Sequence, residues 1–453
     1  MQQETAANVW GGRKLLRLCV PLMFEQLLAF AVGLVDVVMV ARIDEAAMSG
    51  VSLVDSVNFL LIALFSAMAT GGAVVCSQYL GRKDPEKASE AARQLIYLVT
   101  IISTVIMTLA LIFRTPLLSL IYGRLEADVM QNALVYLFVT ALSFPFLAIY
   151  NGGAALFRSM SNSKVSMKIA LAMNLMNFAG NYIGIFVLHQ GVLGAAVSTL
   201  VSRIFAAICI TLLLCRPDCA PIHLRGLLRI RLDWSHIRTI AKIGIPGGVE
   251  GSIFHVGKIM VSRLITEFGT AAIAANAAAS SLSSFVNVPG NAIALAMVTV
   301  VGQCVGARDY PAAKKNVKRL LGASMLAMTV LSLCLFLFRY PLVGIFSSLS
   351  DEGRSTAVQI ITIVAVFSPI FWPLAFSLPS ALRATGDAKY TMFVSILSMW
   401  TCRIGFAYLL GRNMGLGMAG VWLGMTIDWI VRSVLFTTRW LHGRWQEHQL
   451  ISG

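Results

Sequence analysis

Long apolar segments separated by short polar ones make up almost the whole chain. Each segment has about 20 residues or more, which is the length that an α-helix needs to cross a hydrocarbon core about 30 Å thick. Backbone groups in lipid must satisfy one another's hydrogen bonds, and the segments lack the alternation of barrel strands, so the pattern predicts helices. The predicted spans are residues 15–40, 51–79, 92–113, 129–157, 165–188, 190–214, 238–265, 271–305, 317–339, 355–383, 391–410 and 415–440.

Composition indicates that these helices face lipid. Of the 453 residues, 57% are hydrophobic and 13% are charged, whereas soluble domains carry about 25% charged residues. The twelve predicted spans and their short connections use up the chain, so we expect no large soluble domain. The first apolar segment is too long for the core of a signal peptide, and no small-residue cleavage site follows it, so we interpret it as a span.

The distribution of Lys and Arg predicts the orientation. The net charge is +15, and a soluble protein this basic would suggest a nucleic-acid partner. Here 25 of the Lys and Arg residues fall on one side of the predicted membrane and seven on the other. Positively charged short loops are retained in the cytoplasm. We therefore expect an inner-membrane protein with both termini cytoplasmic and no nucleic-acid partner.

The sequence gives no indication of a metal centre or an enzyme. The eight cysteines are scattered, mostly inside apolar segments, as expected of small buried side chains. Cys215 and Cys219 lie near His223, but this spacing fits no standard zinc pattern. There is also no HExxH, paired-Asp metal motif or nucleophile constellation. We expect neither a metal nor another cofactor, and no catalysis.

The second half of the chain repeats the first. A gap of 225 residues separates Gln78 from Gln303, each of which is followed by Gly three residues later. This predicts two six-helix lobes, residues 1–215 and 243–453, joined by a basic cytoplasmic linker, residues 216–242, and related by a pseudo-two-fold axis along the membrane normal. Such duplication is typical of transporters. Other matching pairs are Pro21 with Pro246, Glu25 with Glu250, and Arg158 with Arg383.

Taken in order, the motifs resemble the multidrug and toxic compound extrusion (MATE) family over nearly the whole chain. Each motif alone is weak, and their order and spacing carry the resemblance. It implies an all-α membrane protein that exports small organic molecules. The motifs are residues 34–42, the two Gln-x-x-Gly segments, Asn287-Val288-Pro289, residues 177–181, residues 194–199 and residues 403–410.

The resemblance implies a cation site formed by Asp36, Asn177, Asn181 and Thr199. A carboxylate in a span costs about 2.5–3.5 kcal/mol and needs a reason, and these oxygen donors suit a proton or Na⁺. The alternative is that the two Asn residues hold helices together through hydrogen bonds. Some family members have Asp where this chain has Asn181, which leaves one formal negative charge here and favours proton coupling. Arg203 lies one turn beyond Thr199 and is a candidate to compete with the cation for Asp36.

Several other side chains are candidates for a substrate cavity. Glu25 lies on nearly the same helix face as Asp36, about 16 Å away along the axis. Alternatively, Glu25 is a hydrogen-bonded acid at the bend near Pro21, and Asp55, with Asn58 three residues on, lies near the outer interface. Most apolar candidates at helical spacing serve packing. The set comprises Glu25, Asp55, Glu250, Met39, Met173 and Phe178.

The second half carries a different set of charges. Arg403 occupies the place that Asn177 holds in the first half, and a fixed cation there argues against a mirrored cation site. We expect Arg403 and Asp428 to form a structural ion pair, with Arg432 one turn beyond Asp428. A catalytic role is assigned to none of these residues.

These features predict a secondary active exporter. In this hypothesis a proton or Na⁺ binds at Asp36, and the lobes alternate between inward and outward access to expel amphipathic, often cationic, organic compounds. We expect a monomer whose partners are the substrate and the lipid bilayer. The alternatives are an exporter similar to the flippases of lipid-linked oligosaccharides, which would have a larger and more basic cavity, and a channel, which the duplication and buried acids disfavour.

Overall fold

The computed structural model describes residues 10–40, 43, 45–123, 126–216, 221–224, 226–227, 229–346, 349–447 and 450–451. Within these ranges the secondary structure is helical and contains no strand. The chain divides into two compact units. We call residues 20–248 the N unit, and residues 249–453 together with the segment up to Cys19 the C unit. The boundaries between the units fall inside two long helices, α2 (Gly12–Val40) and α10 (Trp234–Thr266).

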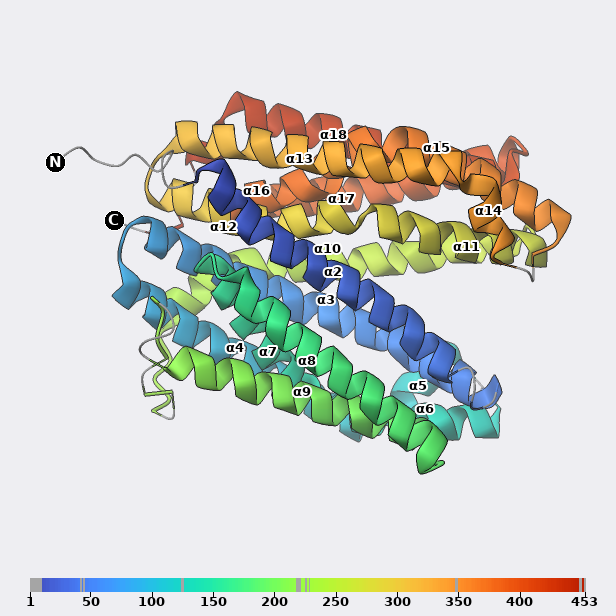
Figure 1. Ribbon diagram of the computed structural model, residues 1–453, viewed down its shortest axis with the longest axis horizontal. Coiled ribbons are helices and arrows are strands. Elements are labelled where there is room, and N and C mark those ends of the chain that lie inside the picture. The colour runs from blue at the N-terminus through green and yellow to red at the C-terminus, as the bar shows by residue number, and fades with distance from the viewer. Residues whose placement is uncertain are drawn as a thin grey trace. The chain divides into compact units, whose positions relative to one another are not determined.

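The N unit is a bundle of helices that occupies the blue to light-green part of the chain in Figure 1. The helices α6 and α7 are bent by 47° where they meet, and the π-helix η1 extends α8. Besides the greater part of α2 and the first half of α10, the unit contains α3 (Glu45–Gly81), α4 (Pro85–Ile112), α5 (Arg114–Tyr122), α6 (Ala127–Leu142), α7 (Phe144–Ser159), α8 (Ser163–Tyr182), η1 (Ile183–Val187) and α9 (Gly191–Cys215).

The C unit follows the same order of elements, with more π-helical segments. Besides the remainder of α10 it contains α11 (Thr270–Val286), α12 (Val288–Gly306), α13 (Tyr310–Leu337), α14 (Arg339–Gly344), α15 (Asp351–Trp372), η2 (Pro373–Ser377), α16 (Leu378–Thr385), α17 (Ala388–Ser398), η3 (Met399–Ile404), η4 (Ala407–Asn413), α18 (Gly417–His442) and the short η5 (Arg444–Glu447).

Each of the twelve predicted spans coincides with one helix or with helices in series, which confirms the all-α fold class. Among the described residues, ten helices, some with their π-helical extensions, are long and apolar enough to cross a membrane, and the bent pair α6–α7 makes an eleventh span. The remaining predicted span corresponds to α10, which is 33 residues long. It carries five charged side chains, at positions 238, 242, 250, 258 and 263. The lobes and linker drawn from the sequence, residues 1–215, 216–242 and 243–453, stay a prediction.

The repeat extends to the capping of two helices. Asp84 accepts a hydrogen bond from the Lys87 backbone N–H (3.1 Å) at the start of α4, and Asp309 accepts one from Ala312 (2.9 Å) at the start of α13. Such caps stabilise a helix by about 1 kcal/mol. The residue before each Asp has a positive φ, 62° at Lys83 and 58° at Arg308. The chain therefore enters α4 and α13 through turns of the same kind.

Glycine pairs bring neighbouring helices together in both units. A Cβ atom on Gly194 of α9 would lie 2.6 Å from the backbone of Gly184 in η1, and one on Gly420 of α18 would lie 2.6 Å from the backbone of Gly411 in η4. Backbones approach this closely only where no side chain intervenes. In the N unit this contact fixes α9 against the helix that carries Asn177 and Asn181.

Candidate cation-binding site

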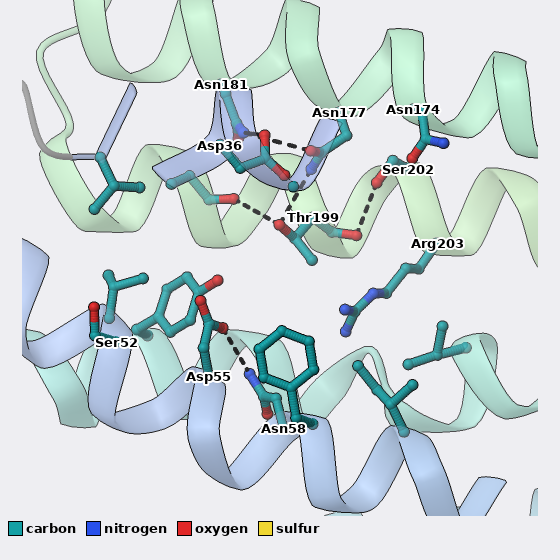
Figure 2. Close-up of a pocket in the computed structure, with 18 of the residues that line it drawn as sticks. Asp36, Ser52, Asp55, Asn58, Asn174, Asn177, Asn181, Thr199, Ser202 and Arg203 are labelled. Atoms are coloured by element: carbon teal, nitrogen blue, oxygen red, sulfur yellow. Dashed lines mark hydrogen bonds between the residues drawn. The ribbon is translucent and has the colours of Figure 1, made fainter. Parts of the chain in front are cut away.

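Three helices of the N unit bring Asp36, Asn177, Asn181 and Thr199 together. Asp36 lies near the end of α2, the two Asn residues share one face of α8, and Thr199 faces them from α9. The Ser198 hydroxyl donates to the Asn177 carbonyl (2.7 Å), which fixes the register of α9 against α8. The four residues proposed from the sequence therefore line the same cavity, as Figure 2 shows.

Neutral amides surround the Asp36 carboxylate. Asn181 Nδ2 donates to Asp36 Oδ1 at 2.9 Å. With the Asn177 amide turned so that its nitrogen faces Asp36, Nδ2 lies 3.2 Å from Oδ2 and 3.3 Å from Oδ1, and its oxygen accepts from the Thr199 hydroxyl at 3.2 Å. This orientation satisfies both ends of the amide. The carboxylate is thus held in place by hydrogen bonds, without a counter-charge from these residues.

A second polar group faces Asp36 across a cavity of about 320 Å³. Asp55 and Asn58 come from α3, with Asn58 Nδ2 3.4 Å from Asp55 Oδ1, and the Tyr136 side chain of α6 lies beside Asp55. Arg203 enters from α9, one turn after Thr199, and its Nη1 donates to Ser143 Oγ at 2.7 Å. Figure 2 shows Arg203 pointing into the space between the Asp36 and Asp55 groups. The cavity therefore contains two carboxylates and one guanidinium.

Two buried oxygen atoms in the cavity wall have no hydrogen-bond donor. Asn181 Oδ1 and Asn58 Oδ1 are both unsatisfied, and their residues are only 3% and 4% exposed. A buried acceptor without a donor costs about 1–3 kcal/mol. Both atoms belong to side chains that line the cavity, so its wall offers amide oxygens as well as carboxylates. This donor set fits a proton, a hydrated hard cation or the ammonium group of an organic molecule.

The residues predicted for a substrate cavity are spread over several places. Asp55 and Met173 line the cavity with Asp36. Met39 is buried in an apolar cluster of the N unit, and Phe178 is 45% exposed on the outer face of α8. Met39, Phe178, Glu25 and Glu250 are not among the residues that line it, and their role in substrate binding stays a prediction.

Glu25 and Glu250 have the same surroundings in their respective units. Arg158 Nη1 lies 3.1 Å from Glu25 Oε1, and the Ser166 hydroxyl donates to Oε2 at 2.9 Å. In the C unit, Glu250 Oε2 lies 3.2 Å from an Arg383 nitrogen, and Oε1 accepts from the Ser395 hydroxyl at 2.8 Å. Each glutamate thus ties a proline-containing helix to two others. The duplicated arrangement supports a structural role for both acids.

Asp428 of the C unit lies between two guanidinium groups. Arg403 Nε is 3.0 Å from its Oδ2, Arg432 Nε is 2.7 Å from its Oδ1, and the Ser398 hydroxyl also donates to it. Both guanidinium groups lie over the Phe254 ring, at 5.1 and 5.6 Å from its centroid. All three charged residues are at most 5% exposed. The sequence suggested the Arg403–Asp428 contact and placed Arg432 one turn beyond Asp428, and the structure joins all three in one cluster.

Two further residues belong to this site that the sequence did not point to: Tyr136 lines the cavity, and Ser143 accepts the hydrogen bond from Arg203. A phenol inside the predicted span 129–157 was the available signal for Tyr136, whereas nothing in the sequence distinguishes Ser143 from other small polar residues of the spans. Among the described residues, no group of three His, Cys, Asp or Glu side chains could hold a metal ion. Cys219, which was considered with Cys215, lies outside the described residues.

The model of the MatE family matches the chain twice, over residues 21–183 and 246–409, which reproduces the repeat seen in the sequence. Among curated relatives, the uncharacterized transporter YisQ of Bacillus subtilis is 28% identical over 432 residues, covering 94% of this chain and 93% of the relative. The probable multidrug resistance protein NorM of Thermotoga maritima is 26% identical and covers 97% of this chain and 94% of its own length.

Solved structures share the fold. A crystal structure of MATE in the straight conformation superposes with a TM-score of 0.90 at 18% identity, covering 99% of this chain and all of the other. A transporter of the MOP superfamily from Pyrococcus furiosus, described as having a binding pocket of reverse polarity, superposes with a TM-score of 0.88 at 18% identity, again over 99% and 100% of the chains.

Proposed function

The chain belongs to the MATE family of multi-pass membrane transporters, and from this membership we propose that it is a cation-coupled exporter of small organic molecules. Its relatives include proteins named for probable multidrug resistance, which supports amphipathic, often cationic, compounds as the cargo. The gradient of a proton or Na⁺ that exchanges at Asp36 would supply the energy for export. No cofactor and no catalytic step enter this scheme.

The observation that carries the proposal is the environment of Asp36. Amides hold the carboxylate, and among the described residues no Lys, Arg or His side chain lies within 4 Å of it. A carboxylate without a fixed partner can bind an exchangeable cation and release it again. Asp428, between two guanidinium groups, has no comparable freedom.

Coupling follows if the cation binds one conformation of the transporter better than another. Neutralising Asp36 removes a charge from among the ends of α2, α8 and α9, so protonation or cation binding changes the free energy of their packing. Export then requires that the conformation favoured by the bound cation be the one that releases the drug outward. The Gly184–Gly194 contact allows α9 and η1 to move as a pair during such a change.

Transport by the purified protein in proteoliposomes tests the function. A fluorescent organic cation should be moved uphill under a proton gradient, a Na⁺ gradient or both, each imposed separately. Transport that ignores both gradients, or that ends when the dye has equilibrated, would contradict cation coupling.

We further propose that the chain lies in the inner membrane with both termini and residues 216–242 on the cytoplasmic side. The excess of Lys and Arg in these segments supports this orientation. Cysteine-reactive or protease tags at the two ends and in the segment 216–242 should be accessible only after the membrane is opened. A periplasmic signal from that segment would contradict both the orientation and the proposed division into lobes.

A further inference from the structure

Arg203 is a fixed positive charge in the wall of the N-unit cavity, where a transporter that binds a metal cation would be expected to have none. It comes from the same face of α9 as Thr199 and points into the space between the carboxylates of Asp36 and Asp55. Both carboxylates lie close enough for their charges to interact with it. Within the described part of the chain, however, no carboxylate oxygen lies within the 4 Å of an ion pair with Arg203.

We propose that Arg203 is the ion-specificity residue of this cavity: it takes the electrostatic place of a metal cation, so that the site accepts a proton and excludes Na⁺. The inference rests on the cation-coupled function proposed above and names its ion. Asp55 is the carboxylate that Arg203 compensates, and Asp36 is the one that takes up the proton.

The charges that face Asp36 support this assignment. Asp55 faces it from α3, Tyr136 from α6 and Arg203 from α9, whereas α8 contributes no charged side chain to the cavity wall, only Met173 and the amides of Asn174, Asn177 and Asn181. With both acids ionised the cavity carries a formal charge of −1, and a single proton neutralises it. A Na⁺ ion would instead have to share a space of about 320 Å³ with a guanidinium that cannot lose its proton. A proton avoids this repulsion because it becomes part of the carboxyl group.

The hydrogen-bond donors and acceptors around the cavity are consistent with Arg203 compensating the charge of Asp55. A guanidinium has five N–H donors and no acceptor, and the bond from Nη1 to Ser143 uses one of them. On the α3 side of the cavity, Asn58 Oδ1 is a buried acceptor without a donor, next to Asp55. The Asp55 group thus offers hydrogen-bond acceptors, which a guanidinium needs. The Asp36 carboxylate already accepts hydrogen bonds from amides, and protonation leaves it able to donate one in turn.

Na⁺ binding to the purified protein tests the inference without any transport measurement. The probe is NaCl titrated against choline chloride at constant ionic strength, and the readout is the midpoint of thermal unfolding in detergent, because an ion that binds only the native state raises it. The parent protein should show no Na⁺-specific change. Arg203→Met removes the fixed charge and should gain a saturable rise of at least about 2 °C, which Asp36→Asn in the same chain should abolish.

Arg203→Lys is the matched control, because it keeps the charge, and it should behave like the parent. If Arg203→Met does not fold, Arg203→Gln, which can still donate to Ser143, replaces it. A Na⁺-specific rise in the parent overturns the inference, as does a folded neutral variant that gains none. Failure of the exporter function would appear instead as absence of gradient-driven transport in proteoliposomes, so the two outcomes are distinguishable.

Discussion

The two units are alike around their glutamates and unlike around their aspartates. Glu25 with Arg158 and Ser166 has its counterpart in Glu250 with Arg383 and Ser395, down to distances that differ by 0.1 Å. Asp36, in contrast, lies among amides, while Asp428 lies between two guanidinium groups. The contacts that tie helices together are thus present in both units, whereas, among the described residues, the aspartate without a charged partner within 4 Å is in the N unit.

The contrast has a simple electrostatic basis. The Asp428 carboxylate contacts two guanidinium groups, and the cluster as a whole carries one positive charge. Removing Asp428 would leave two guanidinium groups buried together without an anion, so such a cluster is a structural constraint. A carboxylate held by neutral donors keeps its position whether or not it is ionised. In the proposed function, the aspartate of the N unit is therefore the one that exchanges an ion, and the aspartate of the C unit is not.

The strongest test of the comparison is to remove the charge of each aspartate in turn. Asp36→Asn keeps the shape and the hydrogen bonds, so the protein should reach the membrane at normal levels and still bind drug. Uphill export under any cation gradient should fall to background, a loss of at least about 100-fold. Initial rates of dye export from proteoliposomes measure this effect.

The matched control is Glu267→Gln, which removes an acid from an exposed ion pair with Arg412 in the C unit. It should export at the parental rate. If Asp36→Asn also does so, Asp36 is not the coupling residue, and Asp55 becomes the candidate in the same cavity.

The second largest effect is expected on stability in the C unit. Asp428→Asn leaves Arg403 and Arg432 together without an anion and should cost about 3–5 kcal/mol, seen as low expression and early thermal unfolding. Arg403→Ala should cost less, because Arg432 still pairs with Asp428. Combining Arg403→Met with Asp428→Asn should recover part of the loss. Normal expression of Asp428→Asn together with failed transport would assign Asp428 a functional role instead.

The smallest effects should come from the duplicated pairs, and they should be equal. Glu25→Gln and Glu250→Gln each weaken a partly buried ion pair, and we expect each to cost about 1–3 kcal/mol. Double-mutant cycles with Arg158→Met and Arg383→Met should give coupling energies that agree within about 0.5 kcal/mol. A Glu25 variant that folds normally but loses export would show that this glutamate has a role that Glu250 does not share.

The fold of this protein is more predictable from its sequence than the candidate site is. Hydropathy alone located every predicted span on a helix, and the repeat appeared in short motifs because both signals depend on near neighbours in the chain. For the site, the spacing of Asn177 and Asn181 placed them on one helix face, and the family resemblance added Asp36 and Thr199. The involvement of Tyr136 and Ser143 could not be predicted in this way, because isolated polar residues on other helices carry no local signal.

The sequence by itself determined the twelve helical segments and the repeat of the first half of the chain in the second. Only the tertiary structure decided which buried acid has a partner. Glu25 meets Arg158 across 133 positions of the chain, and Asp55 shares a cavity with Arg203 from a distant helix. Helix formation depends on hydrophobicity and local hydrogen bonding, whereas the state of a buried charge depends on every charge that folding brings within a few ångströms of it.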